Sequence, residues 1–423
     1  MTVPFVSVVV PTRDRPSLLR YCLKSLALQT FKDFEVIVSD NHTGKTCRCV
    51  FDEVADHRFK YVTPPSPLAM HDNWEYACSF AAGEYVALLT DKTVLRPSAL
   101  RIMHKALEEK PAEIVSWWNE EYVPVAEEHG YDRGRYLQLP QKPRPPYYFE
   151  PIRELVRRFS LDVQRGTEGV HYYWGKICFG AYHRSLVRRI RESIGRLFHP
   201  ACPDYTSMVA ALAYAKKAMD IGQPLLISTR TKDSTGRQTE EQDDFALNWV
   251  RTYDPSLQAL EALPLKGLYT SLHNLVAADY NSMREKIGGP IQDMNLNKIN
   301  LILRAKEDLD RRAAWQDESR KNEQYDAWNR CLSKLSLHGR VSFYHHMYKT
   351  RLFDVKSKIL LYINGFVARR IGQLRILPGF RSSMIPYYRW RLACDSPSRT
   401  FDNILEAARY ADEYYRAILP LGE

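Results

Sequence analysis

The chain has 423 residues, enough for two or three domains, and its 45% hydrophobic and 26% charged residues are ordinary for a soluble globular protein. Its eight cysteines form neither paired C-x-x-C clusters nor a disulfide framework, which argues against structural zinc and favours a reducing compartment. No apolar run approaches the roughly 20 residues of a membrane-spanning helix, and the N-terminus lacks the features of a signal peptide. We therefore expect a cytoplasmic protein, with or without peripheral attachment to the inner membrane face.

The first 120 residues alternate between strand and helix patterns. The expected strands are Phe5–Val10, Phe34–Val38, Phe59–Val62, Tyr85–Leu89 and Ile114–Trp118. Helical spacing of apolar residues predicts helices over Pro16–Ala27, Cys47–Ala55, Asp72–Ala82 and Pro97–Glu109. Near-continuous apolar strands between amphipathic helices indicate an α/β fold with a parallel sheet covered on both faces.

Polar side chains follow several of these strands at the point where each strand ends. They are Thr12, Arg13, Asp14, Asp40, Asn41 and Asp91. Ligands of parallel sheets bind at the carboxyl ends of the strands, so we expect these side chains to converge on one site.

Beyond the fifth strand the pattern weakens. Residues Pro124 to Pro151, rich in Pro, Arg and Tyr, are predicted to form a long surface connection. A helix near Ile152–Phe159, a helix after Asp204 and a strand at Pro224–Thr229 follow. Almost everything after Asp244 is compatible with helix, so we predict a first domain over residues 1–240 and a helical C-terminal domain over 245–423.

Positive charge is concentrated near the C-terminus. The net charge of the chain is +10, and Arg340 to Thr400 contains twelve Lys and Arg against two acids, so the second domain is basic from about residue 340. This predicts an anionic partner, either a membrane surface or nucleic acid. A solvated basic helix face would explain the charge equally well.

Two segments of the first domain carry a family resemblance. VSVVVPTRDRPSLLRYCLKSLALQTFKDFEVIVSDN and HDNWEYACSFAAGEYVALLTD resemble family 2 glycosyltransferases, and the likeness covers residues 5 to 230 approximately. The resemblance implies the GT-A fold, a Rossmann-like and mostly parallel sheet flanked by helices. It also implies inverting transfer of a sugar from a UDP-, GDP- or dTDP-linked donor to a hydroxyl of a glycan or small molecule.

The resemblance implies a nucleotide-sugar site built from the strand ends. The residues carried over to it are Pro11, Thr12, Arg13, Asp14, Asp40, Asn41, Asn73, Asp91 and Lys92. Simpler roles compete for some of them: Asp40 as a turn or cap residue, Arg13 and Asp14 as a salt-bridged loop, and Asn73 as a helix cap.

The family's metal-binding D-x-D motif is reduced here to Asp91, preceded by Thr90 and followed by Lys92. Two interpretations remain open. Asp91 could hold Mn²⁺ or Mg²⁺ together with the donor diphosphate. Alternatively, the Lys92 ammonium could offset the diphosphate charge and make the metal unnecessary.

Asp204 matches the position of the family's catalytic base, which takes the proton of the acceptor hydroxyl. An aspartate at a helix start is also an ordinary cap, and both roles are compatible. His171 and Trp174 lie in an aromatic stretch that is expected on the acceptor side, although packing in the core is the commoner fate of such residues.

Two other functions stay open from the sequence. The basic C-terminal segment would suit glycosylation of hydroxylated DNA or another polyanion. The reduced D-x-D motif would suit a catalytically silent protein that binds a nucleotide-sugar.

Overall fold

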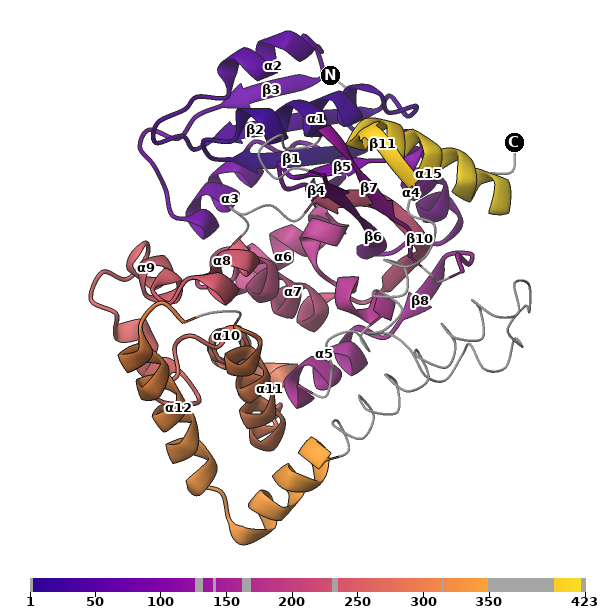
Figure 1. Cartoon of the computed structure of the whole chain (residues 1–423). Helices are drawn as coiled ribbons and strands as arrows, with labels where there is room; N and C mark the ends of the chain where they lie inside the picture. Colours follow the sequence, from indigo (N-terminus) through magenta and orange to yellow (C-terminus); the bar gives the residue numbers. More distant parts are fainter. Residues whose placement is uncertain are drawn as a thin grey trace, which may run out of the picture.

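A computed structural model of the chain describes residues 3–125, 132–139, 142–161, 169–229, 235–312, 315–348 and 399–419. Most of the basic segment, residues 349–398, lies outside this set, and so does the anionic partner surface expected there. Figure 1 shows the described part as a sheet-containing body with a group of helices packed at one side.

One mixed sheet forms the centre of the described structure. Its main path runs in the order β11 (Arg399–Asn403), β7 (Asp132–Leu137), β6 (Ile114–Pro124), β9 (Gly180–His183), β4 (Tyr85–Leu88), β1 (Val6–Thr12), β2 (Phe34–Asp40) and β3 (Phe59–Val62). Beside this path, β10 (Ala218–Thr229) pairs with β6, β5 (Thr93–Leu95) and β8 (Tyr147–Phe149).

The four N-terminal strands of this sheet, β1 to β4, are parallel, as the sequence pattern predicts. β9 lies antiparallel between β4 and β6. Its first residue, Gly180, is therefore at the same edge of the sheet as the carboxyl ends of β1, β2 and β4.

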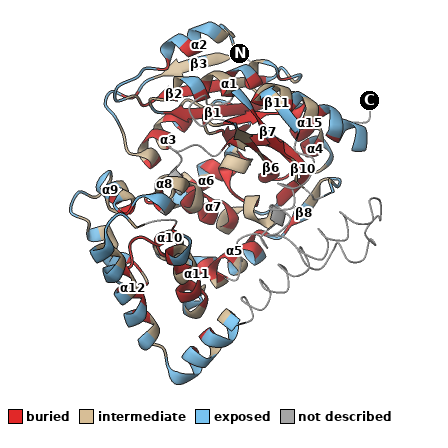
Figure 2. Ribbon diagram, in the orientation of Figure 1, coloured by how far each residue is buried: buried red, intermediate tan, exposed pale blue. Residues whose placement is uncertain are grey.

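Alternate residues of the strands enter two different cores. Val8 and Val10 belong to the cluster that includes α1 (Pro16–Ala27) and α4 (Ala99–Glu109). Val9 belongs to the cluster on the other face, with the helices α3 (Met70–Ser79), α6 (Arg184–Ile194) and α7 (Pro203–Tyr214). Because successive strand residues point to opposite faces, a continuous apolar run is required to cover both. Figure 2 shows the central strands β1, β2 and β10 as buried, whereas β3 and β11 are more exposed.

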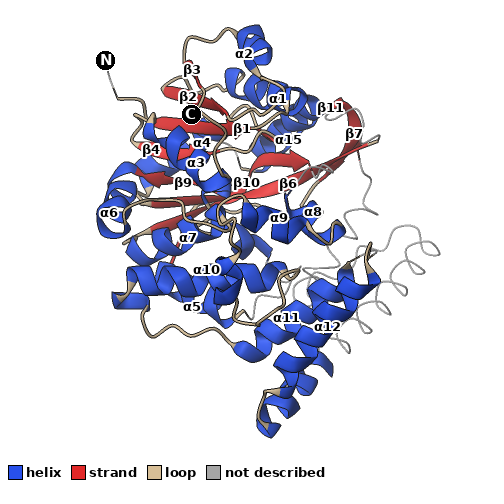
Figure 3. Cartoon of the chain, turned by 90° about the vertical axis from the view of Figure 1, so that its left-hand side faces the viewer, coloured by secondary structure: helices blue, strands red, loops and turns tan. Residues whose placement is uncertain are grey.

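Helices between residues 272 and 348 extend the second core, and Ala246 and Val250 belong to a smaller separate cluster. Residues from Leu265 to Phe343 share one apolar cluster with the sheet, and Figure 3 shows α7, α10 and α5 stacked beneath it. The elements of this part and the remaining short ones are α2 (Arg48–Val54), α5 (Pro151–Ser160), α8 (Thr235–Glu241), α9 (Phe245–Arg251), α10 (Leu272–Ile287), α11 (Lys298–Arg311), α12 (Glu318–Ser333) and a helix over 337–348, with 3₁₀ turns η2 (Gly169–Tyr173), η3 (Ile177–Phe179), η4 (Gln258–Ala262) and η5 (Gly289–Ile291). Within the described residues, none of the helices has the length and apolar character needed to cross a membrane.

Two parts of the structure differ from the predicted organisation. The stretch expected as a surface connection, Pro124 to Pro151, contributes β7 and β8 to the sheet. In β7 the sequence DRGRYL has no run of apolar residues, and the strand pairs with the preceding β6 and with β11, which is distant in sequence.

The C-terminal end of the described chain also belongs with the first domain. β11 pairs antiparallel with β7, and α15 (Ile404–Ile418) packs its apolar face on Tyr122, Tyr136 and Ile227. The predicted division assigned this segment to the helical domain. The sequence pattern predicted that α15 is a helix. It did not predict that this helix packs on the surface formed by Tyr122, Tyr136 and Ile227.

Candidate functional site

The ends of β1, β2 and β4 bring three predicted residues together. Thr12 and Asp40 are direct neighbours in the register of β1 and β2, and Asp91 follows β4 on the other side of β1. The Thr12 hydroxyl donates to Oδ2 of Asp91 at 2.9 Å. All three side chains are buried, so the strand ends form one connected polar edge.

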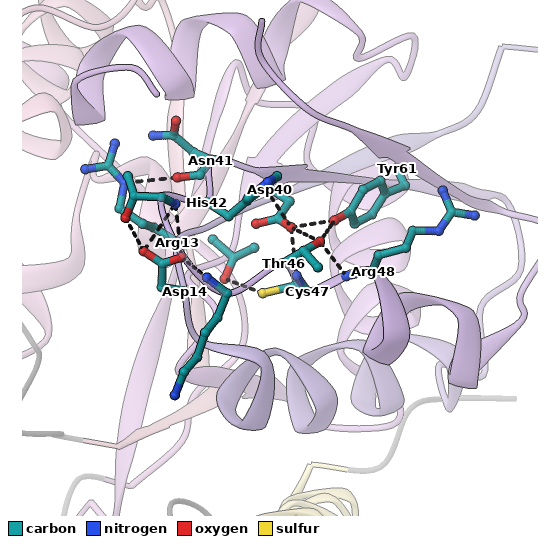
Figure 4. A network of polar contacts seen from close by, with 12 residues as sticks. Arg13, Asp14, Asp40, Asn41, His42, Thr46, Cys47, Arg48 and Tyr61 are labelled. Atoms are coloured by element: carbon teal, nitrogen blue, oxygen red, sulfur yellow. Dashed lines mark hydrogen bonds and ion pairs between the residues drawn. The ribbon is translucent and has the colours of Figure 1, made fainter. Parts of the chain in front are cut away.

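Only one of the two carboxylate oxygens of Asp40 accepts hydrogen bonds from the described residues. Its Oδ2 accepts from the backbone N–H of Cys47 at 2.7 Å, from the Thr46 hydroxyl at 3.1 Å and from the Tyr61 hydroxyl (Figure 4). His42 Nδ1 lies 3.4 Å from the same oxygen. The other oxygen, Oδ1, is buried and has no hydrogen-bond partner among the residues that the structure describes. A buried carboxylate oxygen without a donor is costly, which marks this atom as a place where a ligand N–H or O–H would bind.

Asp14 organises the loop that follows β2. Its carboxylate accepts from the backbone N–H groups of Thr43, Gly44 and Lys45 at 3.0, 2.9 and 2.8 Å, and from the Thr43 hydroxyl. Burial alone would raise the pKa of Asp14, but these hydrogen bonds outweigh it and hold the pKa well below its ordinary value. The oxygens of Asp14 therefore serve the loop (Figure 4).

Asn41 and Arg13 fix the chain before α3. The Asn41 side-chain amide exchanges two hydrogen bonds with the backbone of Leu68, at 2.9 and 2.8 Å, and Arg13 donates to the carbonyls of Asn41 and Leu68. Asn73 accepts from the Ser39 hydroxyl at 2.8 Å, which ties α3 to the end of β2. These contacts tie the chain before α3, and α3 itself, to the end of β2.

Pro11 lies within β1, opposite Ser39 of β2 in the sheet register. The contacts described for Arg13, Asp14, Asn41 and Asn73 are all made within the protein. Binding of a nucleotide-sugar by these four residues and by Pro11 therefore stays a prediction.

Asp91 is held by residues of β1 and of the turn before α1. Besides the Thr12 hydroxyl, the Arg15 guanidinium lies 3.6 Å from Oδ1 of Asp91. Burial raises the pKa of this carboxyl, and Arg15, Thr12 and Lys92 act in the opposite direction. Lys92 continues the chain toward β5, and its carbonyl accepts from the N–H of Thr229 at 3.1 Å.

Asp204 lies in the first turn of α7 and pairs with a lysine that the sequence analysis did not single out. Oδ2 of Asp204 is 3.8 Å from Nζ of Lys176, and the Asp204 side chain is 28% exposed. The Lys176 side chain is fully buried, and its ammonium lies over the rings of Tyr172 and Tyr205 at 3.9 and 3.8 Å. Two aromatic faces and one carboxylate thus hold a buried cation beside the predicted base.

Lys176 connects Asp204 with the sheet, because it lies just before η3 and β9 in the chain. Because β9 begins at the carboxyl edge of β4, the ion pair of Lys176 with Asp204 lies near that edge of the sheet. The roles of Lys92 and Asp204 stay predictions.

The turn that leads into α7 is fixed from the helical part of the chain. Asp279 of α10 is buried and accepts from the backbone N–H of Ala201 at 2.7 Å and of Cys202 at 2.9 Å. Trp249 of α9 donates to the Ala201 carbonyl at 3.1 Å. Burial raises the pKa of Asp279 to about 7, against the effect of the two N–H donors. The helices after residue 240 therefore set the position of Asp204.

Substitution of Asp279 should loosen this turn. Asp279→Ala leaves two buried N–H groups without an acceptor, and we expect the free energy of unfolding to fall by about 2–3 kcal/mol. Denaturant unfolding would measure it, with Asp293→Ala as the control because Asp293 is an exposed acid in the same region. Equal stability of the Asp279 and Asp293 variants would contradict the assigned role.

The two residues expected on the acceptor side pack against each other. The rings of His171 and Trp174 meet edge to face at 4.0 Å. Trp174 stacks on Phe149 at 4.3 Å and donates its indole N–H to Asp220 at 2.6 Å. Burial, and next the charge of Arg157, lower the pKa of His171. These contacts agree with the core interpretation that the sequence left open, so an acceptor-side role stays a prediction.

Three residues that shape the site were missed: Arg15, Lys176 and Asp279. Arg15 stands beside the recognised P-T-R-D segment, and its position before α1 was the available signal. No local sequence pattern indicated Lys176 or Asp279. Lys176 pairs with Asp204 and Asp279 binds the backbone of residues 201–202, and both partners are distant in the sequence.

A Rossmann-like sheet flanked by helices, with its polar residues at the carboxyl ends of the parallel strands, defines a nucleotide-binding α/β protein of the GT-A class. Comparison with known proteins agrees with this class. Residues 7–186 match the model of Glycosyl transferase family 2. The likeness to glycosyltransferase family 2 thus covers the strands and strand ends described above.

Curated relatives match over shorter stretches. A GalNAc(5)-diNAcBac-PP-undecaprenol beta-1,3-glucosyltransferase of Campylobacter jejuni is 36% identical over 109 residues, which are 25% of this chain and 35% of that protein. A validoxylamine A glucosyltransferase of Streptomyces hygroscopicus is 48% identical over 63 residues, 14% of this chain and 15% of that protein. The matches thus span well under two thirds of either relative.

Among solved structures, residues 1–349 of Staphylococcus aureus TarS in complex with UDP-GlcNAc align with a TM-score of 0.45 and 13% sequence identity. The alignment covers 81% of this chain and 92% of the TarS chain.

Proposed function

We propose that the chain is an inverting glycosyltransferase that moves a sugar from a nucleoside diphosphate donor to a hydroxyl group of a glycan or small molecule. The acceptor oxygen attacks the anomeric carbon and forms the new C–O bond on the face opposite the leaving group. The bond between that carbon and the β-phosphate oxygen breaks, and its electron pair leaves with the nucleoside diphosphate. Asp204 takes the acceptor proton.

The observation that carries this proposal is the unpartnered Oδ1 of Asp40 at the end of β2. It is a buried acceptor in a family 2 domain, at the edge where parallel sheets bind nucleotides. A base N–H or a ribose hydroxyl of the donor would supply the missing hydrogen bond. The other oxygen of Asp40 already stabilises the 46–47 turn, so the orientation of the carboxylate is fixed before the ligand arrives.

The position of Asp204 supports the acceptor half of the proposal. Asp204 lies in the first turn of α7, and the Lys176 ammonium is 3.8 Å from its carboxylate. Its partial exposure gives an acceptor hydroxyl access to the carboxylate.

Asp40→Asn tests the donor half. The asparagine oxygen can accept the bonds from Cys47 and Thr46, which turns its NH₂ group toward the ligand position. A donor then replaces an acceptor there, and we expect the affinity for the nucleotide-sugar to fall by roughly tenfold to a hundredfold.

The measurement starts with a thermal-shift screen of UDP-, GDP- and dTDP-sugars on the unaltered protein, followed by calorimetry on both proteins with the sugar that binds. An unchanged melting temperature of the variant without ligand is the control for folding. Equal affinity of the two proteins would contradict the role of Asp40.

Release of the nucleoside diphosphate from the bound donor separates an enzyme from a silent binding protein, because a binding protein leaves the donor intact. Binding of DNA at low salt, with a steep loss as salt rises, would instead favour a polyanionic acceptor. The basic segment that motivates this alternative, and the alternative of an anionic membrane surface, lies mostly outside the described residues.

A further inference from the structure

We propose that the chain holds the diphosphate of its donor with fixed cationic side chains, Arg15 and Lys92, in place of a divalent metal ion. The inference rests on the proposed function, because it concerns the same donor site. It decides between the two interpretations of the reduced D-x-D motif that the sequence left open.

The side chains at the predicted metal position do not fit a divalent ion. Mn²⁺ and Mg²⁺ require several oxygen ligands, and the end of β4 offers the single carboxylate of Asp91. Thr12 donates to one oxygen of Asp91, and the Arg15 guanidinium faces the other at 3.6 Å. The Asp91 side chain is only 5% exposed. A metal bound there would displace a hydrogen bond and lie next to a fixed positive charge.

Other carboxylates at this edge are engaged as well. Asp14 accepts from the 43–45 loop, Oδ2 of Asp40 accepts from the 46–47 turn, and Asp204 pairs with Lys176. Across the described part of the chain, no group of three or more His, Cys, Asp or Glu side chains is arranged to hold a metal ion.

Positive charge is available at the same place. Arg15 precedes α1, and its side chain is 31% exposed. Lys92 follows Asp91 directly in the chain and is partly exposed, and its charge acts to lower the pKa of the Asp91 carboxyl. A guanidinium presents a fork of N–H donors to phosphate oxygens, and an ammonium acts as a compact point charge. Both would stabilise the negative charge that develops on the leaving diphosphate.

The sheet geometry puts these cations at a suitable distance from the nucleoside position. β2, β1 and β4 are consecutive strands of the sheet. Neighbouring strands lie about 4.8 Å apart, so the end of β4 is roughly 10 Å from the end of β2. A nucleotide that meets Asp40 with its base or ribose would cross the end of β1 and bring its phosphates toward Arg15 and Lys92.

Calorimetry in the presence of EDTA tests the proposal directly. UDP, GDP and dTDP are titrated into protein freed of metal, and the one that binds is titrated again with Mn²⁺ and with Mg²⁺. We expect the affinity to be the same in all three conditions. Binding that requires Mn²⁺ or Mg²⁺ would overturn the proposal while leaving the proposed function intact. Absence of binding in every condition would overturn both.

Lys92→Met supplies the second arm. We expect it to weaken binding of the nucleoside diphosphate by about tenfold or more and to leave binding of the matching monophosphate unchanged, because one hydrogen bond to a charged phosphate is lost. Lys92→Arg should restore most of the affinity. Lys24→Met, at an exposed lysine in the last turn of α1, is the matched control. Equal loss for the mono- and diphosphate, or no loss, would contradict the role of Lys92.

Discussion

Asp204→Asn is expected to reduce sugar transfer by about 10²–10⁴-fold while leaving donor binding unchanged. An amide cannot take the proton of the acceptor hydroxyl, but it has nearly the volume of the carboxylate. Asp204 belongs to α7 and forms an ion pair with Lys176, whereas Asp40 and Asp91 lie at the ends of β2 and β4. The substitution should therefore affect chemistry and not the nucleoside end of the site.

Two measurements check this result: calorimetry with the nucleoside diphosphate, and the rate at which donor is converted in the presence of acceptor. Asp52→Asn is the matched control, because Asp52 is an exposed aspartate of α2 that pairs with the exposed Arg48. Full transfer activity in the Asp204 variant would remove the assignment of the base. Loss of donor binding would show instead that Asp204 supports the donor site.

Asp412→Ala is expected to lower the free energy of unfolding by about 3 kcal/mol, since it leaves a buried arginine without its nearest carboxylate. The Arg96 side chain is fully buried, and its Nε lies 3.6 Å from Asp412 of α15. The same carboxylate accepts from the backbone N–H of Ser98 at 3.2 Å. The hydrogen bond from Arg96 to Gln223, at 3.0 Å, would survive the substitution. We therefore expect a loss of unfolding free energy at the lower end of the range for removing one partner of a buried ion pair.

Denaturant unfolding measures this effect, and Glu413→Ala is the control. Glu413 is the next residue of the same helix and is exposed, so its removal should change stability by less than about 0.5 kcal/mol. Equal stability of the two variants would mean that α15 is not anchored by the Arg96 pair. Asp91 and Lys92 lie in the turn before β5, and Arg96 and Ser98 come directly after β5. The contact of α15 with Arg96 and Ser98 therefore lies close in the chain to the predicted donor site.

Much of the nucleotide end of the site follows from sequence patterns. The apolar runs of β1, β2 and β4 predicted parallel strands, and parallel strands bring their terminal residues to one edge. Thr12, Asp40 and Asp91 were identified in this way, and the structure brings all three together. The resemblance to family 2 glycosyltransferases independently predicted the same three residues, and the family match covers these strands.

The hydrogen-bond partners of each side chain could not be predicted from the sequence patterns. Asp14 and Asp40 are both acids at strand ends, but Asp14 has its oxygens occupied by a loop, whereas Asp40 retains one without a partner. The difference depends on where the backbone N–H groups of residues 43–47 point. A sequence pattern indicates that a turn is present and does not indicate those directions.

The sequence by itself determined the parallel half of the sheet, the helices around it and the order of the polar strand ends, because strand and helix periods are local properties. The tertiary structure alone decided that Lys176 lies beside Asp204, that Asp279 fixes the turn before α7, and that α15 returns to the first domain. These contacts join residues as many as 314 positions apart. Their partners are selected by packing and burial in the folded chain, and no local pattern encodes that selection.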